Sequence, residues 1–511
     1  MPSAPTRVAV KLAGISKRFG AVAANADVNL SIAAGTVHGI VGENGAGKST
    51  LMSVLYGFYQ ADSGSIEVDG KPVIIRNSDD AIGLGIGMVH QHFMLVDTLT
   101  ALENMMLGAE PHWLLKRANA KVRLALEKLM QDTGLHVKLD ALAGDLPVGD
   151  QQRLEILKAL YRGAKVLILD EPTAVLTPRE TGHLFKVLDH LRSQGTTILL
   201  ITHKLKEVMG LCDCVTVMRA GRVVQEMPIS EASIESLAEA MVGRKVQMGR
   251  LDDDGRPAGE VLLALRDTEV RDEMQVLRLA GISLELRAGE IVGVAGVSGN
   301  GQSELLDVLS GLRAPTAGEM SVAGKTFTSD AWLDPGTART LGLAHVPEDR
   351  HARAMVMSFA AWESAVLGYD GLPEYNAAGW MRHRAMRSAT AGMMERFDVR
   401  PPNPELGSSK FSGGNQQKLV LARELGQSPK VLLVGQPTRG VDIGAIEFIY
   451  SQLRALRDAG CAVLVVSSEL DEILALSNRV IVMNQGRVTG ELAIEDCSEA
   501  KLGLLMTGGG H

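Results

Sequence analysis

The chain has 511 residues, of which 46% are hydrophobic, 4% aromatic and 22% charged, and its formal net charge is −8. This length suggests about two to four domains, and the apolar content excludes a chain that is disordered throughout. The acidic balance argues against a dedicated nucleic-acid-binding protein, which usually carries a basic surface.

The cysteines and the apolar runs indicate the redox compartment and whether the chain could span a membrane. The four cysteines, Cys212, Cys214, Cys461 and Cys497, are too few and too scattered for a disulfide framework, so we expect a reducing compartment. Cys212 and Cys214 form a C-x-C pair, but no second Cys or His pair lies nearby in the sequence, so buried thiols are favoured over metal ligands. The N-terminal sequence lacks the apolar segment of a signal peptide. The apolar runs are of strand length, so we expect a membrane role only through partners.

The first chemical motif is a glycine-rich loop. An apolar strand is expected at Val37–Val41 and a helix at Leu51–Tyr56, and between them stands Gly42-Glu43-Asn44-Gly45-Ala46-Gly47-Lys48-Ser49-Thr50. Glycines in such a loop let backbone N–H groups surround phosphates at the start of a helix. Lys48 would supply a positive charge and Ser49 a hydroxyl ligand for Mg²⁺. The alternative, a glycine-rich turn before a helix, does not explain the Lys-Ser pair.

Further along the first half, polar residues follow expected strands. Asp170 and Glu171 end the apolar run Lys165–Leu169, where Asp170 can hold Mg²⁺ and Glu171 can orient or deprotonate water. A glutamine such as Gln91 can bind metal and water, and His203 at a strand end can donate a hydrogen bond to a γ-phosphate. A histidine without such neighbours would more often be a core or surface residue.

The two halves of the chain repeat each other. Gly35–Thr50 matches Gly289–Glu304 at an offset of 296 − 42 = 254, and the segments that begin at Leu146 and Phe411 match at 411 − 146 = 265. The boundary falls at 246–259, which is polar and acidic, so we expect domains at 1–245 and 260–511. Alternating strands and helices predict parallel sheets flanked by helices, with mostly helical insertions near residues 111–145 and 361–400.

The second copy lacks the reactive groups of the first. Gln302 replaces the lysine, Gly435 the aspartate, Gln436 the glutamate and Ser468 the histidine, and Glu348 stands where Gln91 stands. These losses should remove most stabilisation of phosphoryl transfer. Weak nucleotide binding through backbone N–H groups stays open for this copy, but we expect no hydrolysis.

The motif set resembles the ATP-binding subunits of ATP-binding-cassette (ABC) transporters over nearly the whole chain. The resemblance implies an α/β fold with two tandem P-loop NTPase domains, each with a mainly parallel sheet core, an antiparallel β part and a helical subdomain. It makes Gln91 the Q-loop residue, Leu146–Gln151 the signature and His203 the switch histidine. Phe19 stands where the family stacks an aromatic ring on adenine, with core packing as the alternative. Metal ligands would then be Ser49, Gln91 and Asp170.

In this family two cassettes close head to tail, so that each ATP lies between one phosphate loop and the opposite signature. The resemblance therefore implies that Ser412-Gly413-Gly414 and Asp442 complete the intact site. The damaged site would instead receive Pro147, which has no N–H or O–H to donate, and Thr177. Defects in both halves fall on one composite site, so we expect one working site with ATP and Mg²⁺ as its ligands.

The resemblance extends to bacterial importers of nucleosides and monosaccharides. The segments LPVGDQQRLEILKAL and HVPEDRHARAMV favour the nucleoside (basic-membrane-protein) branch over ribose-type sugars. The implied partners are two transmembrane permease subunits and, indirectly, a substrate-binding lipoprotein or periplasmic protein. The chain would lie peripherally on the cytoplasmic face of the inner membrane and bind no nucleic acid.

Two questions about partners stay open at this level. Phe93–Met106 and Met355–Ala365 are expected to receive the permeases, with ordinary helix packing as the alternative. A tandem cassette acting on ribosomes or DNA is the other functional class, and its usual long charged linker and two complete sites are missing here. A non-enzymatic ATP sensor is disfavoured because Lys48, Asp170, Glu171 and His203 are all present.

Overall fold

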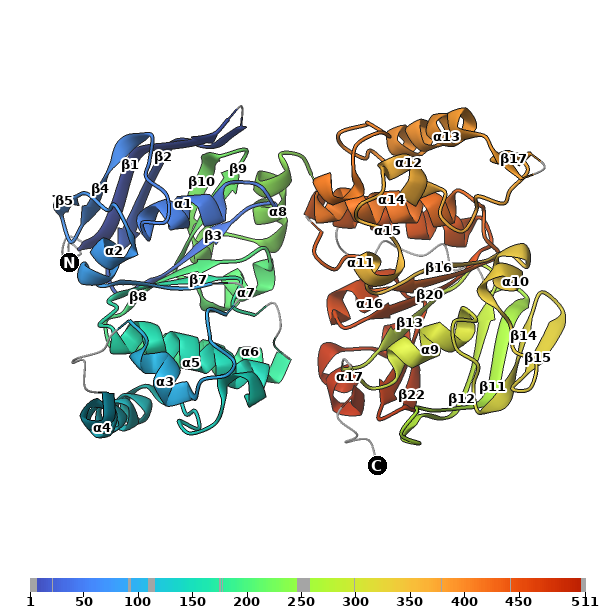
Figure 1. The fold of residues 1–511 in the computed structure, drawn as a ribbon, viewed down its shortest axis with the longest axis horizontal. Coiled ribbons are helices and arrows are strands. Elements are labelled where there is room, and N and C mark those ends of the chain that lie inside the picture. The colour runs from blue at the N-terminus through green and yellow to red at the C-terminus, as the bar shows by residue number, and fades with distance from the viewer. Residues whose placement is uncertain are drawn as a thin grey trace. The chain divides into compact units, whose positions relative to one another are not determined.

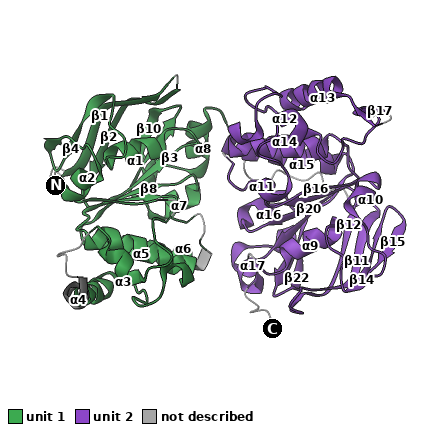
Figure 2. Cartoon of the chain, in the orientation of Figure 1, with its two compact units in different colours: residues 1–246 green, residues 247–511 purple. Residues whose placement is uncertain are grey.

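The computed structural model describes residues 7–20, 22–90, 93–108, 115–173, 176, 178–245, 258–297, 299–377, 379–441 and 443–506. The chain forms two compact units, residues 1–246 and 247–511, which Figure 2 shows in green and purple. Each unit has one six-stranded and one four-stranded sheet, and the order of elements in the first unit recurs in the second (Figure 1).

The six-stranded sheet of the first unit carries the glycine-rich loop. Its strands in spatial order are β10 (Arg222–Pro228), β9 (Cys214–Arg219), β3 (Val37–Val41), β8 (Thr197–Ile201), β7 (Val166–Asp170) and β6 (Ile86–Val89). Neighbouring strands pair in parallel, except for the antiparallel pair of β9 and β10 at one edge. Every residue of β3, β7 and β8 is buried, as expected for apolar parallel strands covered on both faces.

The four-stranded sheet of the first unit is antiparallel. Its spatial order is β2 (Val22–Ala33), β1 (Val8–Phe19), β4 (Ser63–Val68) and β5 (Lys71–Val73). The buried residues Val28, Leu30 and Ile32 alternate along β2, which is typical of a sheet with one covered face. They share a core with Ile40 of β3 and Leu51 of helix α1 (Lys48–Leu55), so α1 is fixed against both sheets.

Helices complete the first unit. They are α2 (Ser78–Gly83), α3 (Ala101–Met106), α4 (Leu115–Thr133), α5 (Val148–Tyr161), α6 (Pro178–Ser193), α7 (Leu205–Leu211) and α8 (Ile234–Val242). Helices α3, α4 and α5 pack against one another as a helical part of the unit (Figure 1). The expectation of a mostly helical segment near residues 111–145 is met by α4, which is followed by irregular chain.

The second unit repeats this plan. Its larger sheet has the order β16 (Leu343–Val346), β19 (Val431–Gly435), β20 (Ala462–Ser467), β13 (Ile291–Ala295), β21 (Arg479–Asn484) and β22 (Arg487–Ala493). Its smaller sheet has the order β12 (Leu277–Arg287), β11 (Val261–Arg271), β14 (Ala317–Val322) and β15 (Lys325–Thr328). Its helices are α9 (Gln302–Leu309), α10 (Pro335–Thr340), α11 (Arg350–Arg353), α12 (Ala361–Ala365), α13 (His383–Arg396), α14 (Gly413–Leu425), α15 (Ile443–Asp458), α16 (Leu470–Leu476) and α17 (Glu499–Met506).

One detail of the second unit differs from expectation. Residues 361–400 contain α12 and α13, but the segment between them forms a hairpin of β17 (Asn376–Ala377) and β18 (Trp380–Met381). Next to this hairpin, Trp362, Tyr375 and Met386 are buried together in a small separate cluster. Strands this short carry no periodic pattern, which is why the sequence did not reveal them.

The α/β class, with a mainly parallel sheet, an antiparallel sheet and a helical part in each unit, is confirmed. No helix among the described residues combines the length and apolar character that crossing a bilayer requires.

Candidate active site

The loop between β3 and α1 approaches its neighbours so closely that glycine is required. A Cβ on Gly42 would lie 2.3 Å from the carbonyl oxygen of Met218, and one on Gly47 would lie 2.2 Å from that of Ala24. Gly47 has φ 95°, in the left-handed region that favours glycine. It precedes α1 without a side-chain cap, so no capping side chain occupies the first N–H groups of the helix, where anions bind.

Lys48 is almost fully buried and lies along this loop. Its Nζ donates hydrogen bonds to the carbonyl oxygens of Gly42, at 2.7 Å, and Glu43, at 3.0 Å. Burial lowers the pKa of Lys48, while the nearby carboxylates of Glu171 and Asp170 oppose the shift. The ammonium group therefore lies between the loop and two carboxylates, the position from which it can meet a polyphosphate.

The carboxylates at the end of β7 have different partners. Asp170 is buried, and burial raises its pKa, while a hydrogen bond from the Ser49 hydroxyl partly offsets that shift. Glu171 lies 2.9 Å through Oε1 from Nδ1 of His203, and this hydrogen bond holds the pKa of Glu171 below its ordinary value. Glu171 has φ 47°, a left-handed conformation that non-glycine residues rarely adopt. The turn after β7 thus holds an ionised carboxylate against a histidine.

The structure adds a buried carboxyl group that sequence reasoning missed. Glu207 accepts hydrogen bonds from the hydroxyls of Thr202, at 3.1 Å, and Thr173, and burial raises its pKa. It therefore links the turn after β7 to the strand end that carries His203. Its counterpart Glu472 is also buried, so the repeat itself contained the signal, because both copies keep a glutamate five residues after a hydroxyl residue, Thr202 in one and Ser467 in the other.

Several predicted residues have a less direct outcome. Gln91, Thr177 and Asp442 lie outside the described residues. Phe19, at the end of β1, is 42% exposed, and its ring meets Tyr59 edge-on at 5.1 Å between centroids. The ring is not part of the core, so that alternative was wrong, and its contact with adenine stays a prediction.

The two signature segments begin their helices differently. Ser412 caps α14, and its Oγ accepts hydrogen bonds from the backbone N–H and the side-chain amide of Asn415. Gly413 is tightly enclosed, because a Cβ there would lie 3.0 Å from the carbonyl oxygen of Gly440. Pro147 stands at the corresponding cap of α5 and makes no side-chain hydrogen bond. A hydroxyl at this position is thus present in the second unit and absent from the first.

In the second unit, the side chain at the position of Lys48 also bonds to its own loop. At the position of Lys48, Gln302 accepts a hydrogen bond through Oε1 from the N–H of Asn300 and donates through Nε2 to the carbonyl of Val297, each at 3.1 Å. A Cβ on Gly296 would lie 2.1 Å from Nε2 of Gln302. The neutral amide therefore folds back over the loop and places no cation there.

In the second unit, the carboxylate that meets the loop serine comes from Glu348 and not from the position of Asp170. At the position of Ser49, Ser303 donates a hydrogen bond of 2.7 Å to Glu348. A Cβ on Gly435, at the position of Asp170, would lie 2.5 Å from Cγ of Glu348. Ser468 keeps contact with Gln436, with 3.2 Å between Oγ and Oε1. The second site thus retains its hydrogen-bond pattern and lacks the lysine, the aspartate and the glutamate of the first.

In the first unit, these groups provide a cation beside a glycine-rich loop, a hydroxyl–carboxylate pair and an ionised carboxylate for water. Phosphoryl transfer to water uses this combination.

Comparisons with known proteins agree with this chemistry. Residues 26–174 and 279–439 match the family model described as ABC transporter. The chain is 42% identical over 503 residues to the nucleoside import ATP-binding protein NupA of Lactococcus lactis subsp. cremoris, with 98% of each chain covered. It is 42% identical to the guanosine import ATP-binding protein NupO of Bacillus subtilis, over 98% of this chain and 97% of NupO. It is 39% identical to the ribose import ATP-binding protein RbsA of Chromobacterium violaceum, over 98% of each chain.

A solved structure shares the fold over most of the chain. The crystal structure of the archaeal ribosome recycling factor aABCE1, in complex with the ribosomal stalk protein aP1, has a TM-score of 0.64 and 19% identity and covers 96% of this chain and 92% of that one. At this identity the likeness concerns the fold alone. Because the family model matches more than half of the chain and relatives above 40% identity span nearly all of it, the chain belongs to the ABC transporter family.

Proposed function

We propose that this chain is the ATP-hydrolysing subunit of a nucleoside importer and that it turns over ATP at one site, built on the first phosphate loop. The observation that carries the proposal is the contrast between the two loops. Lys48, Asp170 and Glu171 stand at the first loop, and Gln302, Gly435 and Gln436 at the second. The ATPase activity follows from the family and the complete first set.

Lys48 and the Ser49–Asp170 pair would bind the nucleotide and its metal ion. Hydroxyl and carboxylate oxygens are the ligands that Mg²⁺ prefers, and Ser49 and Asp170 already lie within hydrogen-bond distance of each other. When bound, Mg²⁺ would neutralise charge on the phosphate oxygens. Lys48 binds the same oxygens from the loop side, and its contacts with the carbonyls of Gly42 and Glu43 hold it there before nucleotide arrives.

Glu171 is the group that acts on the attacking water. The hydrogen bond from His203 keeps the carboxylate ionised at neutral pH, so it can accept a proton or orient water in the transition state. His203 holds this carboxylate in the structure and would reach the γ-phosphate through its ring when ATP is bound. We also propose that Gln91 is a metal ligand and that Phe19 contacts adenine. Ser412-Gly413-Gly414 and Asp442 would complete the ATP site.

The nucleoside is the proposed cargo because two of the relatives that span the chain are named for nucleoside and guanosine import. A ribose-type sugar is the second candidate, favoured by the ribose import relative at 39% identity. In either case two permease chains and a substrate-binding protein select the cargo, and this chain acts peripherally at the cytoplasmic face of the membrane.

The proposed permease surface is narrower than the sequence suggested. In Phe93–Met106, Met94 and Val96 are exposed, whereas the side chains of Leu102, Met105 and Met106 are buried. Helix α3 therefore packs its apolar residues inside, as the alternative held, and the segment before it offers the exposed apolar atoms that a coupling helix could cover.

The test is transport in proteoliposomes that contain this chain with its two permeases and binding protein. We expect ATP-dependent uptake of labelled guanosine that is lost in Glu171→Gln, and no comparable uptake of ribose. Ribose uptake with no nucleoside uptake would select the second candidate, and ATP hydrolysis without either would refute the assignment of cargo.

A further inference from the structure

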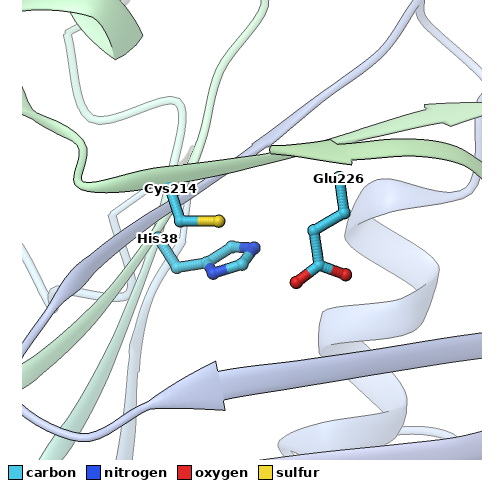
Figure 3. A group of neighbouring side chains, drawn as sticks. All are labelled: His38, Cys214 and Glu226. Carbon is cyan, nitrogen blue, oxygen red and sulfur yellow. The ribbon is translucent and has the colours of Figure 1, made fainter. Parts of the chain in front are cut away.

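Three side chains with metal-binding atoms meet on neighbouring strands of the first unit, away from the residues assigned to ATP. His38 of β3, Cys214 of β9 and Glu226 of β10 place a nitrogen, a sulfur and an oxygen within 4.8 Å of one another (Figure 3). Strand register brings them together, because His38 pairs with Cys214 and Glu226 pairs with Thr216, two residues further along β9. Figure 3 shows the thiol and the carboxylate on either side of the imidazole ring.

The contacts of His38 and Glu226 are compatible with a metal site. His38 is buried and its Nε2 lies 2.8 Å from Oγ1 of Thr216, which holds the ring in place. Among the described residues, no basic side chain forms an ion pair with Glu226.

The equivalent positions of the second unit carry an ion pair in place of this cluster. At the positions of Cys214 and Glu226 this unit has Arg479 and Glu491, which form an ion pair with 2.7 Å between Nη1 and Oε1, and Arg479 also pairs with Glu290 at 3.0 Å. At the position of His38 it has Val292, an apolar residue that pairs with Arg479 across the same two strands. The first unit has kept the carboxylate, has replaced the guanidinium by a thiol, and has gained an imidazole. It has therefore exchanged a built-in cation for two further metal ligands.

We propose that His38, Cys214 and Glu226 bind a divalent cation of the zinc class, with water as the remaining ligand. Zinc prefers imidazole, thiolate and carboxylate ligands in tetrahedral sites. A thiolate and a carboxylate balance its two charges. The carboxylate end is open to solvent, so metal can enter there and the Glu226 side chain can close the remaining distance.

Binding has a defined proton balance. The thiol of Cys214 donates to the carbonyl of Met227 at 3.1 Å; on metal binding the S–H bond breaks, the S–Zn bond forms and the proton goes to solvent. The affinity should therefore rise with pH. The bound ion would tie β3, which leads into the phosphate loop, to β9 and β10, and should raise the thermal stability of the first unit.

The experiment measures zinc on the untagged, nucleotide-free full chain after removal of metal with a chelator. Zinc is titrated against a chromophoric chelator, and the same chain is titrated with cobalt(II), whose thiolate charge-transfer absorption reports a Cys ligand. We expect one zinc ion per chain, a cobalt–thiolate band, and a zinc-dependent rise in Tm. Glu226→Gln changes an exposed side chain, so the variant should fold, and it should weaken zinc binding by about tenfold or more. Cys214→Arg introduces the residue that the second unit has at this position and should abolish zinc binding.

Cys497→Ser is the matched control, because this partly exposed thiol lies outside the cluster and its loss should leave zinc binding unchanged. Cys214→Ser should lose the cobalt–thiolate band while circular dichroism shows a folded chain. Either of two results would overturn the proposal. One is a wild-type chain that binds no zinc when zinc is added back, and the other is a zinc affinity and a cobalt spectrum that persist in Cys214→Ser.

Discussion

Replacing Glu171 by glutamine isolates the catalytic carboxylate from the rest of the site. The amide has nearly the same size and can still accept a hydrogen bond from His203, but it cannot take a proton from water. The low pKa of Glu171 means that the wild-type group is fully ionised at neutral pH, so the variant loses the whole contribution of the base. General-base catalysis contributes about 10²- to 10⁴-fold, so we expect the activation free energy to rise by about 3 to 5 kcal/mol.

The assay combines steady-state phosphate release with retention of labelled ATP on the chain together with its permeases. ATP should be retained in Glu171→Gln because Lys48, Ser49 and Asp170 are unchanged. The matched control is Gln436→Glu, which restores a carboxylate at the equivalent turn; it should add no activity, because Gln302 and Gly435 still provide neither cation nor metal ligand. Hydrolysis near the wild-type rate in Glu171→Gln, or a clear gain in Gln436→Glu, would refute the assignment of the working site.

Three further predictions concern the hydrogen bond of the base, the number of nucleotides and stability. His203→Ala removes the hydrogen bond that lowers the pKa of Glu171, so the acid limb of the kcat–pH profile should move to higher pH; an unchanged limb would contradict that role. Fluorescent ATP should bind to one site per chain, with at least about tenfold weaker binding in Lys48→Ala and no change in Gln302→Ala. Two sites of equal affinity would contradict the expected loss of nucleotide binding at the second loop. Burial raises the pKa of Glu472 from 4.5 to about 7, so the folded state holds this proton more tightly than the unfolded state and loses stability as pH rises from about 4.5 to about 7. In Glu472→Gln, the free energy of unfolding should no longer fall by this amount, about 3 kcal/mol. The measurement is urea unfolding at about pH 5 and about pH 8, and equal pH dependence in variant and wild type would disprove the role of Glu472.

The fold class could be predicted because its signals are local. An apolar strand that ends in a glycine-rich loop and a helix is specified within about twenty residues, and the repeat supplied each element twice. The segment that contains the hairpin of β17 and β18 was instead predicted as mostly helical, because two-residue strands carry no period. Along Phe93–Met106 the sequence left permease contact and helix packing open, because an amphipathic pattern does not say what covers the apolar face.

The residues of the candidate site divide in the same way. Lys48, Asp170 and Glu171 were identifiable because their chemistry follows from their neighbours in the chain. Glu207 was missed because its role depends on two hydroxyl groups that reach it from the ends of two different strands. The sequence showed that Gln302 and Glu348 had replaced reactive residues, but the contacts that these side chains make are visible only in the tertiary structure.

The sequence by itself determined that the chain is a duplicated ABC ATPase with one intact set of reactive residues, since each set is encoded by short contiguous motifs. Only the tertiary structure decided how the second loop is filled, with Gln302 bonded to Asn300 and Glu348 in the space opposite Gly435. The tertiary structure also placed two possible metal ligands beside Cys214. His38 is far from Cys214 in the sequence, and Glu226 lies on the neighbouring strand β10. Strand pairing and its register are set by packing of the whole sheet, so no local pattern can reveal which side chains they bring together.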